Sequence, residues 1–474
     1  MTLPAKFVER VLRDLGGTEG AALCAALDAE PPVSVRLNPA KTGADTLPAG
    51  PDAGLPVPEA AGLPALAIAG RVPWSRDGRY LAVRPSFTLD PDFHAGAYYV
   101  QEASSQFVGH LLAAVRTEGA RILDLCAAPG GKTTLYASLA GPDGLVVANE
   151  IDRRRASVLA DNVRKWGTGN VAVTTCEPRA LGDFEAWFDV VAVDAPCSGE
   201  GMFRKDPDAR GEWSEGNVKQ CAARQDEILR EAWRALKPGG TLVYSTCTFN
   251  RDEDEGALER MAAWAGDEIA ESEETAVEDA WGIVCGRVGA FRTFRFYPHR
   301  TCGEGFFAAV ARKSFDAGGR VRAPKARRTV FAAVDRKTAG ELARWVRNPG
   351  GMRFAAVADT CYAWYAAQAD AVRTLSEALP VIYSGVALGQ VFKGVLKPDP
   401  ALAFFDGLNR GALPAAELDD EETLRFLRRQ DIAAGGLAEG MNLVCSRGRA
   451  LGFAKRIGAR VNNLYPSSLR IIKQ

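Results

Sequence analysis

Apolar residues in the middle of the chain fall into short continuous runs, separated by longer stretches with helical spacing. The runs predict strands near residues 121–125, 145–150, 170–175, 188–194 and 240–246. The stretches beside them predict helices near residues 132–140, 153–165, 218–236 and 252–265. Strands that alternate with helices form parallel sheets covered on both faces. The pattern therefore predicts a doubly wound, mostly parallel, Rossmann-like α/β domain.

Weaker patterns flank this domain on both sides. Residues 5–29 have the spacing of two helices divided by Gly16 and Gly17, and residues 33–38 read as a short strand. Two aromatic-rich runs, at 291–297 and 306–311, predict an antiparallel strand pair at the edge of the sheet. We expect the sheet domain to close near residue 315.

Length and composition narrow the class of protein. A chain of 474 residues is too long for one ordinary core, so several domains are expected. The N-terminus is charged and amphipathic, unlike a signal peptide, and no apolar stretch is long enough to predict a membrane span. The ten cysteines are scattered without a Cys-x-x-Cys motif. This usage is typical of reduced thiols in the cytoplasm.

Charge is distributed unevenly, although the net charge is only −1. Residues 252–279 carry 12 acidic groups and one basic group, which we interpret as a solvated face. Residues 287–328 carry 11 basic and two acidic groups, and residues 447–473 carry seven basic and no acidic groups. Aromatic and Asn residues are interleaved with these cations, which favours contact with phosphates in a nucleic acid.

A glycine-rich turn joins the first predicted strand to its helix, and its residues are Cys126, Ala127, Ala128, Pro129, Gly130, Gly131 and Lys132. Such a turn lets a ligand approach the backbone and the amides of a helix N-terminus. The end of the turn resembles a triphosphate-binding loop, but Cys126 occupies the first glycine position of that motif. Glu150 ends the next strand, about 20 residues further on, where such folds hold a ribose hydroxyl. Spacing therefore favours a nucleoside cofactor, with S-adenosylmethionine the leading candidate.

Two further segments follow predicted strands, at 194–201 and 244–248. Strand ends line the ligand crevice of this fold, so Asp194, Cys197 and Cys247 are expected beside the methyl donor. A thiolate that adds to carbon 6 of a pyrimidine makes carbon 5 nucleophilic. Asp194 can hold or protonate N3 of a cytosine as charge develops there. These groups suit methylation of carbon 5 of a base that has left its stack.

Other readings of the two cysteines were weighed. A lone cysteine at a strand end is usually a small buried apolar residue. Two cysteines in Pro-Cys and Thr-Cys turns beside one cofactor loop favour a functional pair instead. A disulfide between them is geometrically open but disfavoured in a reducing compartment. A zinc site needs more ligands, and the three histidines lie elsewhere in the sequence, so no metal is expected.

The most specific motifs are DLCAAPGGKT at 124–133, Asn149-Glu150, DAPCSGEGMFRKDP at 194–207 and YSTCT at 244–248. In these motifs the chain resembles the Sun-type RNA cytosine-5 methyltransferases, and most closely their bacterial RsmF/YebU-like ribosomal RNA branch. SVRLNP at 34–39 and VQEASS at 100–105 are similar to the family's N-terminal elements. The matching segments span roughly residues 30–313.

The resemblance implies roles for individual residues. Cys247 would be the nucleophile, and Cys197 the thiol that helps to release the product. Asp194 would contact base and cofactor, residues 126–132 would line the methionine and ribose, and Glu150 would bind the ribose hydroxyls. The family usually carries an Asp near the adenine amine after the third strand. Glu177 occupies that neighbourhood here and is our candidate.

The resemblance also implies four parts of the chain. These are an N-terminal α+β RNA-binding domain at 1–95, the methyltransferase domain at 96–315, a linker and small domain at 316–385, and a β-rich, PUA-like RNA-binding domain at 386–474. The expected partner is ribosomal RNA or the small ribosomal subunit. We expect a monomer with no obligate protein partner.

The expected reaction is formation of 5-methylcytosine in small-subunit (16S) ribosomal RNA. The same chemistry on tRNA stays open, although the long C-terminal extension favours ribosomal RNA. A catalytically silent ribosome assembly factor is the alternative from another class, and the intact cysteines argue against it. A nucleotide hydrolase is opposed by the missing loop glycine.

Overall fold

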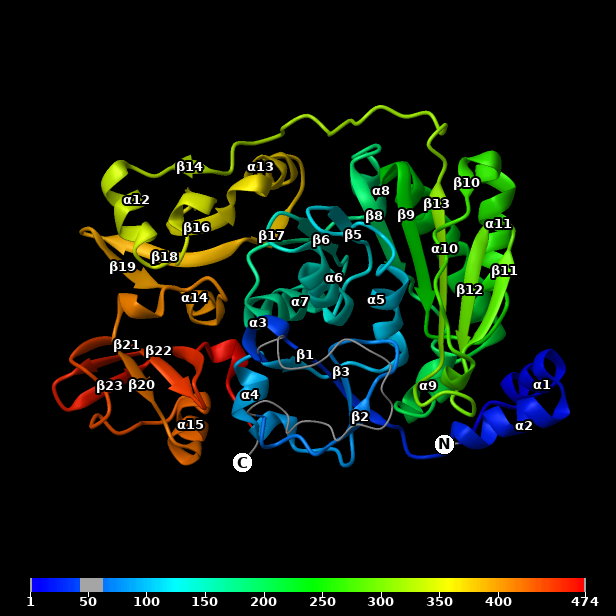
Figure 1. Cartoon of the computed structure of the whole chain (residues 1–474), viewed down its shortest axis with the longest axis horizontal. Coiled ribbons are helices and arrows are strands. Elements are labelled where there is room, and N and C mark those ends of the chain that lie inside the picture. Colours follow the sequence, from blue (N-terminus) through cyan, green and yellow to red (C-terminus); the bar gives the residue numbers. More distant parts are fainter. Residues whose placement is uncertain (1, 43–62, 473–474) are drawn as a thin grey trace.

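A computed structural model of the chain describes residues 2–42 and 63–472, which form four β-sheets with flanking helices (Figure 1). Lys473, at the end of the basic C-terminal run, lies outside these residues. Across the described ranges, no helix combines the length and apolar character needed to cross a membrane.

The largest sheet contains all five strands predicted between residues 121 and 246. Its order is β11-β12-β13-β9-β8-β5-β6-β7-β17, and β10 pairs with β13. Strands β9, β8, β5, β6 and β7 run parallel, and the other pairings are antiparallel. The strands are β5 (Arg121–Asp124), β6 (Leu145–Asn149), β7 (Val171–Thr174), β8 (Phe188–Asp194), β9 (Leu236–Thr246), β10 (Ile269–Ala270), β11 (Val284–Val288), β12 (Phe291–Phe296), β13 (Phe306–Lys313) and β17 (Val381–Ser384). The predicted α/β fold and its antiparallel edge pair are confirmed.

Helices cover both faces of this sheet because its central strands bury side chains on both sides; β6 is buried along its whole length. One face packs against α5 (Phe107–Leu111), α6 (Gly131–Ala140) and α7 (Arg153–Trp166). The other face packs against α8 (Pro178–Gly182), α10 (Glu215–Ala235), α11 (Glu255–Ala265) and α13 (Ala369–Ala378). The two apolar cores that result hold the strand ends in fixed positions.

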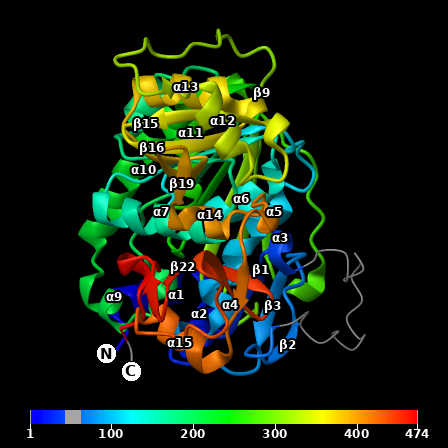
Figure 2. The same ribbon diagram turned by 90° about the vertical axis from the view of Figure 1, so that its left-hand side faces the viewer.

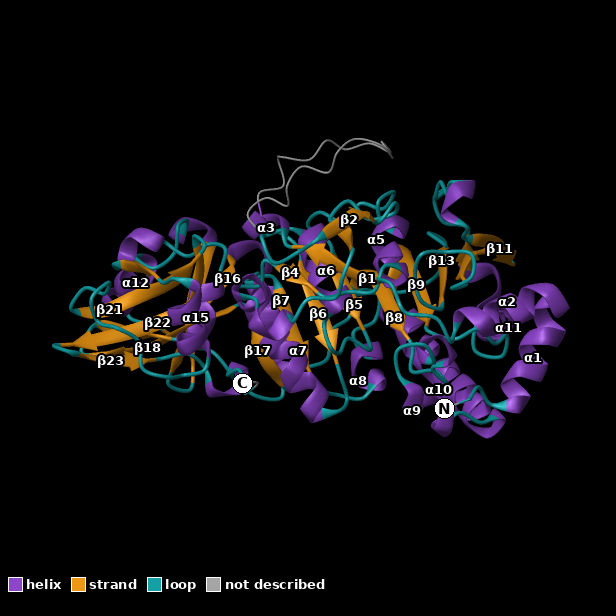
Figure 3. Ribbon diagram, turned by 90° about the horizontal axis from the view of Figure 1, so that it is seen from below, coloured by secondary structure: helices purple, strands orange, loops and turns teal. Residues whose placement is uncertain are grey.

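The N-terminal part forms a four-stranded sheet in the order β2-β3-β1-β4. Its elements are α1 (Ala5–Leu15), α2 (Gly17–Ala26), β1 (Val33–Leu37), α3 (Pro39–Thr42), β2 (Ile68–Arg71), β3 (Gly78–Leu81), α4 (Pro91–His94) and β4 (Tyr98–Tyr99). Helices α1 and α2 leave this sheet and pack near α9 (Pro207–Glu212), at one end of the molecule (Figure 3). There the ring of Phe7 packs against the rings of Phe203 and Trp213, with centroid distances of 5.0 and 5.9 Å.

We expected the large sheet to close near residue 315, but a later strand also belongs to it. After β13 the chain runs across one edge of the molecule (Figure 1) and returns as β17, which pairs with β7 at the far edge. The expectation failed because strands that follow one another in sequence usually pair with each other. The four residues of β17 carry no pattern that indicates pairing with a strand far away in the sequence.

Two small sheets make up the rest of the chain, in the orders β14-β15-β16-β18-β19 and β20-β21-β22-β23. Their elements are β14 (Ala332–Ala333), α12 (Arg336–Ala343), β15 (Met352–Val357), β16 (Thr360–Tyr365), β18 (Val386–Phe392), β19 (Val395–Pro398), α14 (Pro400–Phe404), β20 (Ala415–Glu417), α15 (Asp420–Leu427), β21 (Gly440–Ser446), β22 (Arg449–Ile457) and β23 (Arg460–Asn463).

The division that we predicted between 316–385 and 386–474 is wrong, because it cuts the five-stranded sheet. Strand β18 pairs with β16, so residues on both sides of the division share one core. The chain passes from β17 to β18 through Gly385 alone, whose φ of +60° suits glycine. A Cβ at Gly385 would also collide with the Ala363 carbonyl oxygen. One glycine inside a continuous apolar run gives no visible sign of a change of sheet.

A buried ion-pair cluster fixes the last sheet to the N-terminal part. Asp92 of α4 accepts hydrogen bonds from Arg447 at 2.9 Å and from Arg449 at 2.8 Å. The Asp92 side chain is 1% exposed, whereas Asp420, which also pairs with Arg447, is 67% exposed. The cluster therefore couples two regions more than 350 residues apart.

Replacing Asp92 by Ala should lower the free energy of unfolding by about 3 kcal/mol, because two arginines would lose their buried counter-charge. Asp420→Ala removes an exposed partner of the same arginine and should cost less than about 1 kcal/mol. Urea unfolding of both variants measures the difference. Equal stabilities would contradict a structural role for the cluster.

Candidate active site

The predicted ligand-binding loop leaves β5 at Asp124 and enters α6 at Gly131. Gly130 has a φ of +110°, and a Cβ there would come within 3.0 Å of the Leu159 side chain, so both backbone and space favour glycine. Tyr99 and Asn162 both donate hydrogen bonds to the Pro129 carbonyl, at 3.1 and 2.8 Å. The N-terminal sheet and α7 thus hold the loop from two sides.

Lys132 and Asp194 meet where β5 and β8 end. Lys132 Nζ donates to Asp194 Oδ2 at 2.8 Å, and Ser245 Oγ donates to Asp194 Oδ1 at 2.8 Å. Burial alone would lower the pKa of Lys132, but Asp194 and, more weakly, Asp124 and Cys247 outweigh it and raise the pKa. The ammonium is therefore a firmly charged group close to Cys247.

The two cysteines of the predicted pair come together. Cys197 Sγ lies 3.3 Å from Cys247 Sγ, and both are free thiols. This separation exceeds a disulfide bond of about 2 Å. The hydrogen bond with Cys247, then burial, and then the charges of Cys247 and Glu253 raise the pKa of Cys197 well above its ordinary value. Cys197 therefore stays protonated when Cys247 carries a thiolate.

A buried carboxylate joins the two cysteine loops. Glu253 accepts hydrogen bonds from Ser198 N at 2.9 Å, Gln225 Nε2 at 3.0 Å and Asn250 Nδ2 at 2.7 Å. Ser198 Oγ and Thr248 Oγ1, one from each loop, lie 3.1 Å apart. Burial raises the pKa of Glu253 although these hydrogen bonds oppose it. The network sets the positions of both loops.

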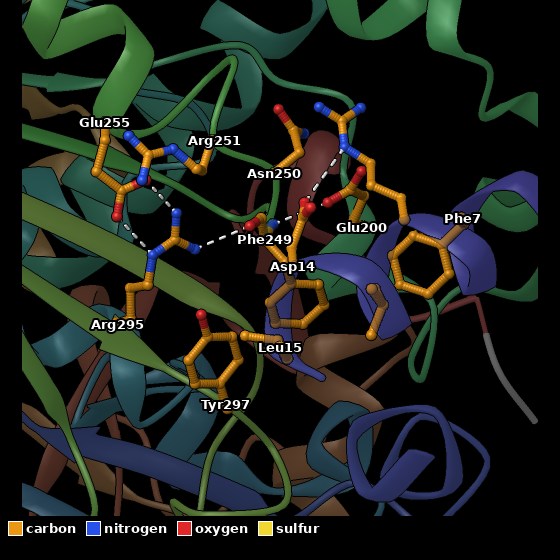
Figure 4. Close-up of a pocket in the computed structure, with 12 residues that line it drawn as sticks. Phe7, Asp14, Leu15, Glu200, Phe249, Asn250, Arg251, Glu255, Arg295 and Tyr297 are labelled. Atoms are coloured by element: carbon orange, nitrogen blue, oxygen red, sulfur yellow. Dashed lines mark hydrogen bonds and ion pairs between the residues drawn. The ribbon is translucent and has the colours of Figure 1, made fainter. Parts of the chain in front are cut away.

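The acidic segment 252–279 is therefore not simply a solvated face, because Glu253 and Asp254 are fully buried. Arg295, in the basic segment predicted to contact phosphates, instead pairs with Asp254 and Glu255. It also donates to the Phe249 carbonyl at 2.9 Å, two residues beyond Cys247 (Figure 4). Three further arginines of the basic segment pair with the acidic one: Arg287, Arg292 and Arg312.

The pocket in Figure 4 lies between α1 and the segment that follows Cys247. Phe7 and Leu15 come from α1, while Phe249 and Asn250 come from the cysteine loop. The rings of Phe249 and Tyr297 stack at 5.9 Å. The N-terminal helix therefore supports the cysteine loop from the side.

Glu150 and Glu177, both predicted to contact the cofactor, have different surroundings. Glu150 is 5% exposed, accepts a hydrogen bond from Asp152 N at 3.0 Å and pairs with Arg155 at 3.3 Å. Glu177 is exposed at the start of α8. Asn149 donates to the Cys176 carbonyl at 2.9 Å, which brings the ends of β6 and β7 together. Both glutamates thus lie at strand ends along the same edge.

Asp124 is a site residue that our reading of the sequence missed. It accepts a hydrogen bond from Thr133 at 2.6 Å through Oδ2, while its buried Oδ1 has no hydrogen-bond partner within the described part of the chain. Burial, reinforced by Asp194 and Glu150, raises the pKa of Asp124 to about 7. Its position at the carboxyl end of a strand, before a glycine-rich turn, was the available signal.

The charges beside the loop discriminate between the ligands we considered. Asp124, Glu150 and Asp194 are close enough for the latter two to raise the pKa of the first. A triphosphate would add like charge to this group, whereas a ligand with a sulfonium and an ammonium would be attracted. In residues 2–42 and 63–472, no cluster of three or more His, Cys, Asp or Glu residues suits a metal ion.

Comparison with known proteins gives consistent matches along the chain. The family model of 16S rRNA methyltransferase RsmB/F matches residues 111–312, that of the RsmF N-terminal domain matches 3–103, and that of the RsmF PUA domain matches 414–471. Ribosomal RNA small subunit methyltransferase F of Shewanella loihica is 32% identical over 418 residues, covering 84% of this chain and 83% of that protein. The protein of the same name from Escherichia coli is 32% identical over 425 residues, covering 84% of each.

A solved structure shares the central fold. The methyltransferase homolog protein from Pyrococcus horikoshii is 27% identical, with a TM-score of 0.53. The alignment covers 65% of this chain and 94% of that one. The shared fold therefore accounts for most of that protein but for only about two thirds of this chain.

Replacing Glu253 by Ala should remove three buried hydrogen bonds, leave the Ser198 amide without its acceptor, and lower the free energy of unfolding by about 3 kcal/mol. The cysteine loops should also lose their alignment, so that turnover falls at least about 10-fold. Glu259→Ala, on the exposed side of α11, is the matched control and should change neither quantity. Urea unfolding and methyl transfer to RNA test this, and full activity of a folded Glu253→Ala variant would contradict it.

Proposed function

We propose, from the premise that this chain belongs to the RsmB/RsmF family of 16S ribosomal RNA methyltransferases, that it forms 5-methylcytosine in small-subunit ribosomal RNA. The enzyme class follows from the family. The cytosine specificity rests on one observation, the approach of the Cys197 and Cys247 sulfur atoms to 3.3 Å beside Asp194 and Lys132.

The residues around the loop fit S-adenosylmethionine as the cofactor. Asp124 has a buried oxygen without a hydrogen-bond partner among the described residues, and this oxygen can accept a hydrogen bond from a cationic ligand. We assign the backbone amides of residues 126–132 to the cofactor and Glu150 to its ribose hydroxyls, and Glu177 remains our candidate for the adenine amine. When bound, the cofactor supplies an electrophilic methyl group.

The proposed reaction proceeds through a covalent intermediate on the RNA. The Cys247 thiolate adds to carbon 6, and the electron pair of the 5,6 double bond makes carbon 5 a nucleophile that takes the methyl group. Asp194 holds or protonates N3 as charge develops on the ring. A base then takes the carbon-5 proton, the C–H electron pair re-forms the 5,6 double bond, and the Cys247 thiolate leaves, with Cys197 assisting release. Any proton that N3 received returns to Asp194.

Electrostatics support Cys247 rather than Cys197 as the nucleophile. Cys247 lies close enough to the Lys132 ammonium to help to raise the pKa of that lysine, so a cation accompanies this sulfur atom. Cys197 lies close to Glu253, whose charge helps to raise the pKa of that thiol. Two adjacent thiolates would repel each other, so the pair does not ionise at both sulfur atoms at once.

The proposed partner is ribosomal RNA, either free or within the small subunit. The match of residues 414–471 to a PUA domain model supports an RNA-binding role for the last sheet, and we assign residues 1–95 a similar role. We propose a monomeric enzyme that acts in the cytoplasm without an obligate protein partner. The same chemistry on tRNA and a silent assembly factor are the competing functions, and the paired thiols argue against the second.

The two cysteines should fail in different ways when replaced. Cys247→Ala should lower turnover by more than about a thousand-fold and form no covalent RNA adduct, because the attacking group is gone. Cys197→Ala should accumulate an adduct that survives a denaturing gel, because addition proceeds while release is impaired. Cys302→Ala, an exposed cysteine, is the control and should behave as the unaltered protein. Identical behaviour of the first two variants would contradict the assigned roles.

Deleting the gene should remove 5-methylcytosine from small-subunit ribosomal RNA. Mass spectrometry of nucleosides from purified 16S ribosomal RNA, with bisulfite mapping, measures the loss and locates the affected position. Restoring the gene should restore the modification, whereas the Cys247→Ala form should not. Unchanged ribosomal RNA together with loss of 5-methylcytosine from tRNA would transfer the function to tRNA.

A further inference from the structure

A groove that the proposed reaction does not use lies where three parts of the chain meet. Its cavity of about 360 Å³ has a lining that includes Lys41, Phe404, Asp406, Arg347, Arg410 and Arg449. Lys41 belongs to α3, Phe404 ends α14, and Arg449 begins β22, and Figure 2 turns this side of the molecule toward the viewer. Three parts of the chain therefore contribute to its lining, namely residues 40, 41 and 95, residues 347, 403–406 and 408–410, and residues 448–450.

The groove has a surplus of positive charge. Four cations line it, of which Arg449 is already paired with Asp92, and Asp406 is the one acid among its lining residues in the described ranges. Within those ranges Lys41, Arg347 and Arg410 form no ion pair with any carboxylate; they donate instead to carbonyl oxygens. Lys41 donates to the Ala95 and Lys165 carbonyls at 2.7 and 2.8 Å, and Arg410 donates to the Gly448 carbonyl at 3.0 Å. Cations with only neutral partners keep most of their charge available to an anion.

Burial of Lys41 and Asp406 in the groove shifts their pKa values toward the neutral forms. It lowers the pKa of Lys41 to about 7, and Lys165 and Arg449 add to the effect while Asp406 opposes it. Burial also raises the pKa of Asp406, one of whose oxygens has no hydrogen-bond partner in the part of the chain described. Asp406 therefore supplies too little counter-charge for the cations around it. An anion in the groove would supply the remainder.

We propose that this groove binds the phosphate backbone of the substrate RNA at a point remote from the target cytosine. The proposal rests on the function proposed above and assigns a role to the five-stranded sheet. Arg347 and Arg410 are exposed at the rim, where a phosphate can reach them, and Lys41 lies deeper. Guanidinium groups bind phosphate oxygens through paired N–H donors, and such contacts position RNA without reading its sequence.

Helix α7 sets the distance between the groove and the cofactor loop. Near its start, Arg155 donates to the Ala128 carbonyl of that loop at 3.1 Å, and near its end Lys165 accepts from Lys41. A helix of 14 residues is about 20 Å long. The groove therefore contacts RNA several nucleotides away from the base in the active site, as a second anchor that orients the substrate.

The test compares a double variant, Arg347→Ala with Arg410→Ala, with a control of equal net charge, Arg234→Ala with Arg373→Ala. Both control arginines are partly exposed and already paired with carboxylates. Binding to an unmodified 16S ribosomal RNA transcript is measured over a series of KCl concentrations, with S-adenosylmethionine affinity, kcat and KM in parallel. The groove variant should bind about 10-fold more weakly, with the slope of log K against log salt reduced by about 1.5. Its KM for RNA should rise while kcat and cofactor affinity stay unchanged.

Each other outcome is also informative. Equal losses of RNA affinity in the groove and control variants would mean a general effect of charge and would overturn the proposal. Competition with RNA by millimolar inorganic phosphate alone would indicate a site for a small anion and would also overturn it. If the groove variant is destabilised, Arg347→Lys with Arg410→Lys keeps the charge and should restore the salt slope; failure to do so in a folded protein would also overturn it. An unaltered protein that binds neither RNA nor cofactor would instead refute the proposed function.

Discussion

The hydrogen bonds to the Glu253 carboxylate are the constraint on which the active site depends. Adjacent parallel strands are only about 4.8 Å apart, so β8 and β9 bring Asp194 and Ser245 side by side. Each strand continues into a loop, and the pairing of the two strands does not by itself hold these loops against each other. Glu253 accepts hydrogen bonds from Ser198 on one loop and from Asn250 on the other. Each cysteine lies between the end of its strand and one of these two residues, so the two sulfur atoms are brought together. Arg295 adds a third restraint by holding the Phe249 carbonyl.

The same burial that positions the thiols also makes them unequal. Lys132, with a firm positive charge, lies close to Cys247, whereas Glu253 lies close to Cys197. A thiolate is therefore disfavoured on Cys197. The acids Asp124, Glu150 and Asp194 make the neighbouring crevice suitable for a cationic methyl donor and hostile to polyphosphates. The proposed catalytic roles therefore rest on fixed charges as well as on the cysteines themselves.

Much of this arrangement could be predicted from the sequence because it lies at strand ends. The loop at 126–132 and the segments with Cys197 and Cys247 each follow an apolar run, and parallel strands bring such segments to one edge. Glu253 was missed because it belongs to a strongly acidic stretch. The composition of such a stretch indicates solvent exposure, and the sequence does not distinguish its buried acids from their exposed neighbours. The route of the chain after residue 315 was missed because β17 finds its partner about 200 residues earlier. Pairing at that distance is decided by tertiary contacts, which local patterns do not contain.

The central claim is that Cys247 forms the bond to the pyrimidine and Cys197 does not. The most direct measurement uses RNA whose cytosines carry fluorine at carbon 5, since fluorine cannot leave as the proton does and the adduct persists. After incubation with S-adenosylmethionine, protease and nuclease digestion followed by mass spectrometry identifies the modified peptide. We predict a nucleotide attached to Cys247 alone. Attachment to Cys197, or a methylated product with no attachment to either cysteine, would contradict the claim.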